Sequence, residues 1–212
     1  MRGVIERLAD PEALNLHRYA PPEVGSQRSA VLVLFGPGGG SGDDPDNDGP
    51  DVLLIERAAT LRKHAGQIAF PGGAADDGED DPAVTALREA GEEVGLDPSS
   101  AEVVAYFPEV WIPGSNYAVT PVIAWWRHPH PVGVVDVAEV ARVARLPLAE
   151  LVDPDNRLRV RHPSGFVGPA FEVRGMLVWG FTALVLSTLL DLAKWSVPWN
   201  EDRIKQLPEV RL

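Results

Sequence analysis

The chain contains no cysteine among its 212 residues, which excludes disulfides, thiolate metal sites and cysteine nucleophiles. Positive charge is also scarce, because 19 Lys and Arg stand against 31 Asp and Glu, for a formal net charge of −12. Such an acidic chain is not expected to bind nucleic acid or an anionic membrane, since either would need a basic surface. An anionic substrate would have to meet local positive charge, supplied by metal ions or by a few Arg and Lys side chains.

Long hydrophobic runs are missing as well. The most apolar stretch, residues 175–190, is too short to cross a bilayer comfortably, and we interpret it as a buried helix. The first residues are too charged for a secretory signal. With 45% apolar residues the chain can bury a sizeable core, so we expect a cytoplasmic protein with one domain.

We divide the chain into a core domain and two flanking segments. The domain covers residues 26–195, with an N-terminal extension at residues 1–25 and a C-terminal tail at residues 196–212. Both ends contain several prolines and mixed charges, and they could pack on the domain or pair with a second copy in a homodimer. Residues 36–50 have the low complexity of a mobile loop, without the Gly-Lys-Ser/Thr ending of a phosphate-binding loop.

Short apolar runs between glycine-rich or polar turns predict an α/β fold. Strands are expected at residues 30–35, 51–57, 67–70, 103–108, 117–126 and 140–146, and helices at 148–152 and 179–194. The strand at 67–70 leads through a glycine turn into an acidic helix. This order places the acidic side chains of the helix at a sheet edge.

Three carboxylates crowd onto that helix, because Glu89, Glu92 and Glu93 are three and four residues apart and share one face. Each like-charge pair costs about 0.2–0.5 kcal/mol on an isolated helix, and a divalent cation is the usual way to reverse that cost. The geometry therefore suggests a metal site. A solvated acidic surface is the alternative that the helix alone leaves open.

The limits of the acidic helix are well marked. Asp80 or Asp81 can cap its N-terminus, Pro82 suits the first helical position, and Gly95 can close its C-terminus.

Residues 73–96 as a whole resemble the signature of the Nudix hydrolases, which is Gly, five residues, Glu, seven residues, then Arg-Glu-apolar-any-Glu-Glu-any-Gly-apolar. The positions at which this signature specifies a residue type hold Gly73, Glu79, Arg88, Glu89, Ala90, Glu92, Glu93, Gly95 and Leu96. One departure is visible, because eight residues, 80–87, separate Glu79 from Arg88. The extra residue precedes the helix, so it leaves the metal-binding half intact and the role of Glu79 open.

Residues 53–73 resemble a second motif, which belongs to the coenzyme A diphosphatase branch of that family. The motif runs Leu-Leu-Thr-any-Arg-Ser/Ala, then Arg, Gly and Phe-Pro-Gly-Gly. Here its positions hold Leu53, Leu54, Arg57, Ala58, Arg62, Gly66, Phe70, Pro71, Gly72 and Gly73, with Ile55 in place of Thr. Members of this branch tend to have the longer spacing before the Arg-Glu pair, so the departure noted above supports the branch.

The resemblance implies a Nudix fold, an α/β/α sandwich around a mixed β-sheet. It also implies metal-dependent hydrolysis of coenzyme A or acyl-coenzyme A, a small-molecule diphosphate, to 3′,5′-ADP and 4′-phosphopantetheine or its acyl derivative. Mg²⁺ or Mn²⁺ would be the cofactor, with Glu89, Glu92 and Glu93 as ligands. One alternative is a Nudix hydrolase of ADP-ribose, NADH or a nucleotide sugar. Another is a non-catalytic Nudix module that binds a nucleotide and regulates a partner.

The expected catalytic residues are the three glutamates and Arg88. One glutamate could also be the base for the attacking water, and the sequence does not say which; Glu139 is a further candidate. Arg88 is expected to orient a carboxylate by a charge-assisted hydrogen bond, with direct substrate contact as the alternative.

The expected substrate-binding residues lie upstream of the helix. Arg57 and Arg62 would meet phosphates of coenzyme A, and surface solvation is the alternative for both. Gly72 and Gly73 would let the backbone turn tightly and approach the substrate.

Overall fold

The computed structural model describes residues 27–38, 49–112 and 116–207. The expected N-terminal extension at 1–25 and most of the expected loop at 36–50 lie outside these residues, so both stay predictions. The described part contains a large sheet with a long helix on each face, together with a second, smaller sheet. This arrangement confirms the predicted α/β class and the α/β/α sandwich.

The strands divide into two sheets, and their bounds follow. The large sheet contains β1 (Gln27–Gly36), β2 (Asp51–Arg57), β3 (Ile68–Ala69), β4 (Gly72–Ala74), β5 (Ala101–Tyr106), β6 (Val110–Ile112), β7 (Tyr117–Trp126) and β8 (Val140–Pro147). The smaller sheet contains β9 (Arg157–Arg161), β10 (Val167–Val173), β11 (Met176–Val178) and β12 (Ile204–Gln206). The helices are α2 (Pro82–Val94), α3 (Leu148–Val152) and α4 (Gly180–Leu192), with 3₁₀ turns at Pro98–Ser100 and Pro154–Asn156.

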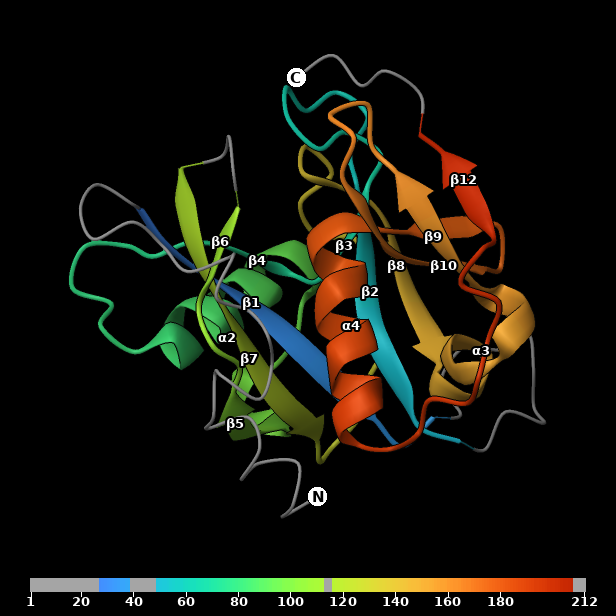
Figure 1. Cartoon of the computed structure of the whole chain (residues 1–212). Helices are drawn as coiled ribbons and strands as arrows, with labels where there is room; N and C mark the ends of the chain where they lie inside the picture. The colour runs from blue at the N-terminus through green and yellow to red at the C-terminus, as the bar shows by residue number, and fades with distance from the viewer. Residues whose placement is uncertain (1–26, 39–48, 113–115, 208–212) are drawn as a thin grey trace.

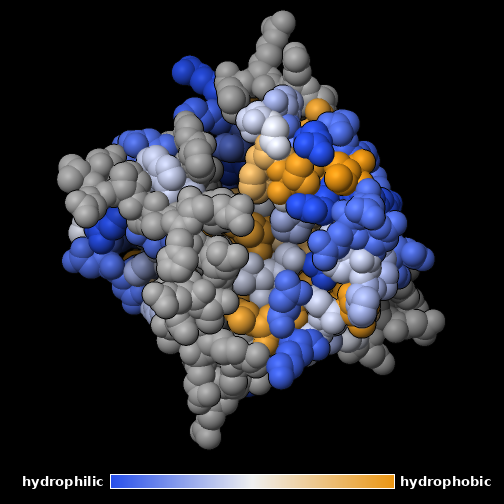
Figure 2. Space-filling view, in the orientation of Figure 1, coloured by the Kyte–Doolittle hydropathy of each residue, from blue (hydrophilic) through white to orange (hydrophobic). Residues whose placement is uncertain are grey.

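The large sheet is mixed, as the sequence predicted. Its strand order is β3-β2-β1-β7-β5, with β4 paired to β1, β6 to β7 and β8 to β2. Only β1 and β7 run parallel among these pairs of described strands. In Figure 1, α4 crosses in front of β1 and β2, and the smaller sheet lies to its right. Figure 2 shows that apolar residues reach this face in patches among polar ones.

Strand β1 shows why the sheet is covered on both faces. Leu32 and Leu34 are fully buried in the cluster that includes α2, whereas Val33 between them is buried in the cluster that includes α4. Because successive side chains of a strand point to opposite faces, a continuous apolar run needs a partner on each side. Burying one such side chain contributes about 1.5–3 kcal/mol, so the run fixes the position of both helices.

Helix α2 begins and ends where its sequence signals predicted. Of the two candidate caps, Asp81 is the N-cap, and its carboxylate accepts a hydrogen bond from the Ala83 N–H at 2.9 Å. Gly95 ends the helix in the left-handed conformation, with φ 72°. Its N–H donates to the carbonyls of Ala90 and Gly91. The acidic face of α2 is thus held by local capping at both ends.

The smaller sheet was not predicted, and it corrects the interpretation of residues 175–190 as one buried helix. Arg174 and Gly175 both have positive φ, at 51° and 75°, and they form a two-residue turn that pairs Val173 with Met176. Residues 176–178 are therefore strand β11, and α4 begins only at Gly180. None of the helices in the described part of the chain is long and apolar enough to span a bilayer.

Strand β12 lies in the segment that we assigned to the C-terminal tail. It pairs in parallel with β9, and Leu207 directly after it is buried. The domain limits at residues 26 and 195 stay predictions, and the structure adds that β12 of the tail pairs with β9 of the domain.

Candidate active site

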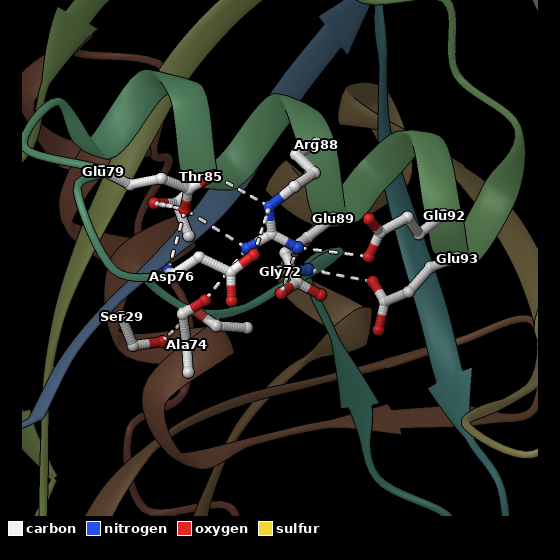
Figure 3. Close-up of polar contacts among 11 residues, drawn as sticks. Ser29, Gly72, Ala74, Asp76, Glu79, Thr85, Arg88, Glu89, Glu92 and Glu93 are labelled. Carbon is white, nitrogen blue, oxygen red and sulfur yellow. Dashed lines mark hydrogen bonds and ion pairs between the residues drawn. The ribbon is translucent and has the colours of Figure 1, made fainter.

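Arg88 lies at the centre of a group of carboxylates on and before α2 (Figure 3). Its guanidinium donates to Glu89 at 3.0 Å and to Glu92 at 3.1 Å, one helical turn further on. It also donates to the Ala74 carbonyl at 3.1 Å, which ties the helix to β4. Because a guanidinium can bind several oxygens in fixed directions, Arg88 holds the glutamate face of α2 in one arrangement.

Glu79 joins this group in spite of the extra residue that precedes the helix. Its two carboxylate oxygens accept from Arg88 Nε at 2.8 Å and Nη2 at 3.2 Å. The Thr85 hydroxyl donates to it at 2.7 Å, and the Asp76 N–H donates at 3.0 Å. The hydrogen bond from Arg88, followed by the other two, lowers the pKa of Glu79 to about 2. Of residues 80–87 only Asp80 and Asp81 precede α2, and the extra residue leaves Glu79 in contact with Arg88.

Glu93 joins α2 to the glycine turn at β4. It is only 3% exposed, and its Oε2 accepts a hydrogen bond from the Gly72 N–H at 2.9 Å. Burial raises the pKa of Glu93 to about 7, although the Gly72 N–H and the charge of Arg57 act in the opposite direction. Its other oxygen, Oε1, is buried without a hydrogen-bond partner.

Glu89 lies directly against the second glycine of that turn. A Cβ atom added to Gly73 would lie 2.6 Å from the Glu89 Cδ, so only glycine leaves room for the carboxyl group as placed. Partial burial raises the pKa of Glu89, while Arg88 lowers it. The turn at Gly72 and Gly73 thus contacts two of the three glutamates expected to bind metal.

The residues present fit a divalent metal ion by their chemistry. Glu89, Glu92 and Glu93 offer hard carboxylate oxygens, which suit Mg²⁺ or Mn²⁺. A buried carboxylate oxygen without a partner, as at Glu93 Oε1, needs an ion, a water or a donor to satisfy it. In this structure the Arg88 guanidinium lies between Glu89 and Glu92. Among the described residues, no three His, Asp or Glu side chains converge on a single position for an ion.

Arg57 lies at the end of β2, beside Glu93 and Glu139. Its guanidinium is 3.8 Å from a Glu139 carboxylate oxygen, and its charge lowers the pKa of Glu93. Arg62, the other arginine expected to meet phosphates, is exposed on the connection between β2 and β3 and forms no ion pair with the described residues. The fold therefore brings Arg57, Gly72 and Gly73 to the glutamates, while Arg62 stays at the surface.

Three further residues shape this group and were not predicted from the sequence. Thr85 and Asp76 both contact Glu79 or Arg88, and Ser29 on β1 donates to the Gly73 carbonyl at 2.6 Å. Thr85 could have been found, because it is three residues before Arg88 and shares its helix face. Ser29 could not, since only the pairing of β1 with β4 brings it to Gly73.

A separate cavity of about 340 Å³ is lined in part by residues 65–67 of the β2–β3 connection. Its lining includes the apolar side chains of Ile68, Met176, Leu177 and Trp179. No residue of α2 lines it.

Comparison with known proteins gives consistent matches over most of the chain. Residues 27–164 match the family model described as "NUDIX domain". The protein named "Uncharacterized Nudix hydrolase NudL" from Cronobacter sakazakii is 40% identical over 147 residues, which span 66% of this chain and 73% of that protein. The protein of the same name from Escherichia coli K12 is 38% identical over 147 residues, with the same coverage of 66% and 73%.

A solved structure shares the fold. It is the crystal structure of a Nudix hydrolase from M. smegmatis, RenU, with a TM-score of 0.54 at 21% identity. The match covers 86% of this chain and 98% of that one. At this level of identity the likeness concerns the fold alone.

Proposed function

Because this chain belongs to the Nudix family and is therefore a hydrolase, we propose that it cleaves the diphosphate of coenzyme A or acyl-coenzyme A. The products would be 3′,5′-ADP and 4′-phosphopantetheine or its acyl derivative. The observation that supports this substrate best is the hydrogen bond between Gly72 N–H and Glu93, at 2.9 Å. It joins the last part of the coenzyme A diphosphatase motif, residues 53–73, to the acidic helix.

In the proposed reaction, Glu89, Glu92 and Glu93 would hold Mg²⁺ or Mn²⁺ beside the glycine turn. Such an ion, when bound, would polarise a phosphoryl oxygen and lower the pKa of a bound water. Gly72 and Gly73 would let the backbone come close to the diphosphate, because neither presents a side chain there. Arg88 would keep Glu89 and Glu92 in place through its hydrogen bonds, and Arg62 would meet phosphate from the surface.

Hydrolysis forms one bond between the water oxygen and a phosphorus atom and breaks one bond to the bridging oxygen. The water proton passes to a carboxylate of the site or to solvent. Each product then ends in a phosphate monoester. Because the net charge of the chain is −12, this anionic substrate would need local positive charge, from a bound metal ion and from cations such as Arg62.

A substrate panel with Mg²⁺ and with Mn²⁺ tests the proposal. It should contain coenzyme A, acetyl- and longer acyl-coenzyme A, ADP-ribose, NADH, a nucleotide sugar and a nucleoside triphosphate. We expect the coenzyme A compounds to have the highest kcat/KM, with 3′,5′-ADP identified as a product by mass. Far faster cleavage of any other compound would reject the coenzyme A assignment, and no turnover of any compound would favour a binding module.

The metal assignment has its own test. Glu92→Gln and Glu93→Gln should each lower kcat by about 10²–10⁴, the range for loss of a directly participating group, without unfolding the protein. Glu102→Gln is the matched control, because it removes a carboxylate on the edge strand β5, away from the group around Arg88. Normal turnover in both Glu92→Gln and Glu93→Gln would contradict the assignment.

A further inference from the structure

The pairing of β8 with β2 changes register at the active-site end of the two strands. The pairing is regular from Asp51↔Pro147 to Glu56↔Arg142, and then Arg57 pairs with Val140. Ala141 is the extra residue, so β8 contains a β-bulge at this point. A bulge re-aims the side chains that follow it and is frequent beside active sites.

The bulge brings Glu139 next to Arg57 by two contacts. The Ala58 N–H donates to the Glu139 carbonyl at 2.7 Å, which fixes the backbone of Glu139 at the end of β2. The carboxylate of Glu139 then lies 3.8 Å from the Arg57 guanidinium. The Glu139 side chain is 49% exposed, so this ion pair contributes little to stability.

The segment that leads to Glu139 also contacts the end of α2. The Val135 N–H donates to the Glu93 carbonyl at 3.0 Å, and the charge of Glu139 adds to the effect of burial in raising the pKa of both Glu89 and Glu93. Two buried polar atoms of opposite charge in this region have no hydrogen-bond partners, namely Arg57 Nε and Glu93 Oε1. Unpaired buried atoms of this kind indicate a position for water or for a ligand.

The carboxylates of this region differ in how many hydrogen bonds their oxygens accept. Glu89 and Glu92 accept from Arg88, and Glu93 accepts from Gly72 and is buried. Glu139 has only the long contact to Arg57 and stays half exposed. Among these four glutamates of the described chain, Glu139 is therefore the one whose carboxylate oxygens both remain without a hydrogen bond from a protein donor.

We propose that Glu139 orients the attacking water as a fourth carboxylate of the site, and that Arg57 acts as a positioning residue that holds Glu139 there. This inference rests on the proposed diphosphatase function but not on coenzyme A as the substrate. It replaces the sequence-based expectation that Arg57 binds substrate phosphate. Arg57 then affects the reaction through Glu139, and its removal should lower turnover without weakening substrate binding.

A double-mutant cycle on the full chain separates these two roles of Arg57. The variants are Arg57→Gln, Glu139→Gln and the double variant, measured with whichever diphosphate of the panel is turned over. We expect both single variants to lower kcat by about ten-fold or more with KM nearly unchanged. The double variant should be no slower than Glu139→Gln alone, because residues that act as one unit are not additive.

The neighbouring ion pair provides a matched control. Glu56 and Arg142 face each other one step before the bulge, 3.0 Å apart, on the same two strands. Alternation along the strand directs their side chains to the other face of the sheet from Arg57. Glu56→Gln and Arg142→Gln should leave kcat and KM within about two-fold, since surface ion pairs contribute little.

Three results would overturn the inference. The first is a rise in KM for Arg57→Gln at unchanged kcat, which would mark Arg57 as a substrate-binding residue. If this rise disappears with dephospho-coenzyme A, Arg57 binds the 3′-phosphate, and the proposed function stands while the inference fails. The second is a double variant whose losses multiply. The third is normal turnover in Glu139→Gln.

Thermal unfolding of each variant shows whether the fold is intact. If Arg57→Gln fails to fold, Arg57→Lys keeps a positive charge beside Glu139. It should then retain more of kcat than Glu139→Gln does, with an unchanged KM, and a raised KM would count against the positioning role.

Discussion

Replacing Gly73 with Ala should disable the site while leaving the fold intact. The added Cβ would lie 2.6 Å from the Glu89 Cδ and Oε1 and 2.7 Å from its Oε2. Non-bonded carbon contacts are favourable at about 3.5–4.0 Å, so the carboxyl group must move by about 1 Å. The carboxyl group is the end of a flexible side chain, and it can make this shift without disturbing the backbone.

This shift should lower kcat and leave the stability of the fold nearly unchanged. A misplacement of about 1 Å in a catalytic constellation costs about 10²-fold in rate, so kcat should fall by that factor with Mg²⁺ or Mn²⁺. The backbone of Gly73 is not in the left-handed region, and Ala there restricts the unfolded chain, which stabilises by about 0.4–1 kcal/mol. We therefore expect the melting temperature to change by no more than about 4 °C.

Gly72→Ala provides the contrasting variant. Its Cβ would lie 2.3 Å from the Ala30 carbonyl oxygen and 2.6 Å from the Val31 Cα, both of which are backbone atoms of β1. Gly72 also has a φ of 151°, which side chains rarely adopt. This variant should lose stability, as calorimetry or denaturant unfolding would show. Full activity in Gly73→Ala, or unfolding of Gly73→Ala to the same extent as Gly72→Ala, would refute the reasoning.

Two further predictions concern the capping of α2 and the attachment of β12. Asp81→Ala removes the N-cap acceptor and should cost about 1 kcal/mol by thermal unfolding, whereas Asp81→Asn keeps an acceptor and should retain most of that stability. Equal losses in the two variants would contradict the capping role. A hydrogen bond from Lys205 lowers the pKa of Glu172, so this carboxylate stabilises the fold above its unfolded pKa, and that contribution is lost as the pH falls through the lowered folded pKa. Glu172→Gln should therefore be less stable than the parent at pH 7 by up to about 1 kcal/mol, with the difference shrinking toward pH 3 in urea unfolding. A difference that is independent of pH would contradict this coupling.

The acidic helix could be predicted in detail because its signals are local. Asp81, Pro82 and Gly95 fix its ends through hydrogen bonds and backbone preferences that involve only near neighbours. The strands of the large sheet were also predicted well, since continuous apolar runs such as residues 30–35 mark strands that are buried on both faces. The smaller sheet was missed because its strands are short and pair with segments distant in the sequence, as β12 does with β9.

The candidate site likewise has one part that could be predicted from the sequence and one part that could not. The sequence by itself determined that Glu89, Glu92 and Glu93 share a face with Arg88, because helix periodicity sets which side chains are neighbours. It also supplied the two glycines that contact those glutamates. The sequence could not show that Glu79 keeps its contact with Arg88, since the conformation of the segment that leads from Glu79 into α2 depends on the surfaces it packs against.

Only the tertiary structure decided the position of Arg57. The resemblance placed it among the substrate-binding residues, whereas the β-bulge at Ala141 places Glu139 beside it, 82 positions later in the sequence. Strand register is set by the packing of whole sheets and not by nearby residues, so a contact that depends on a register shift is invisible to local patterns. The sequence thus determined the helix with its carboxylates, and the pairing of distant strands determined which other charges face them.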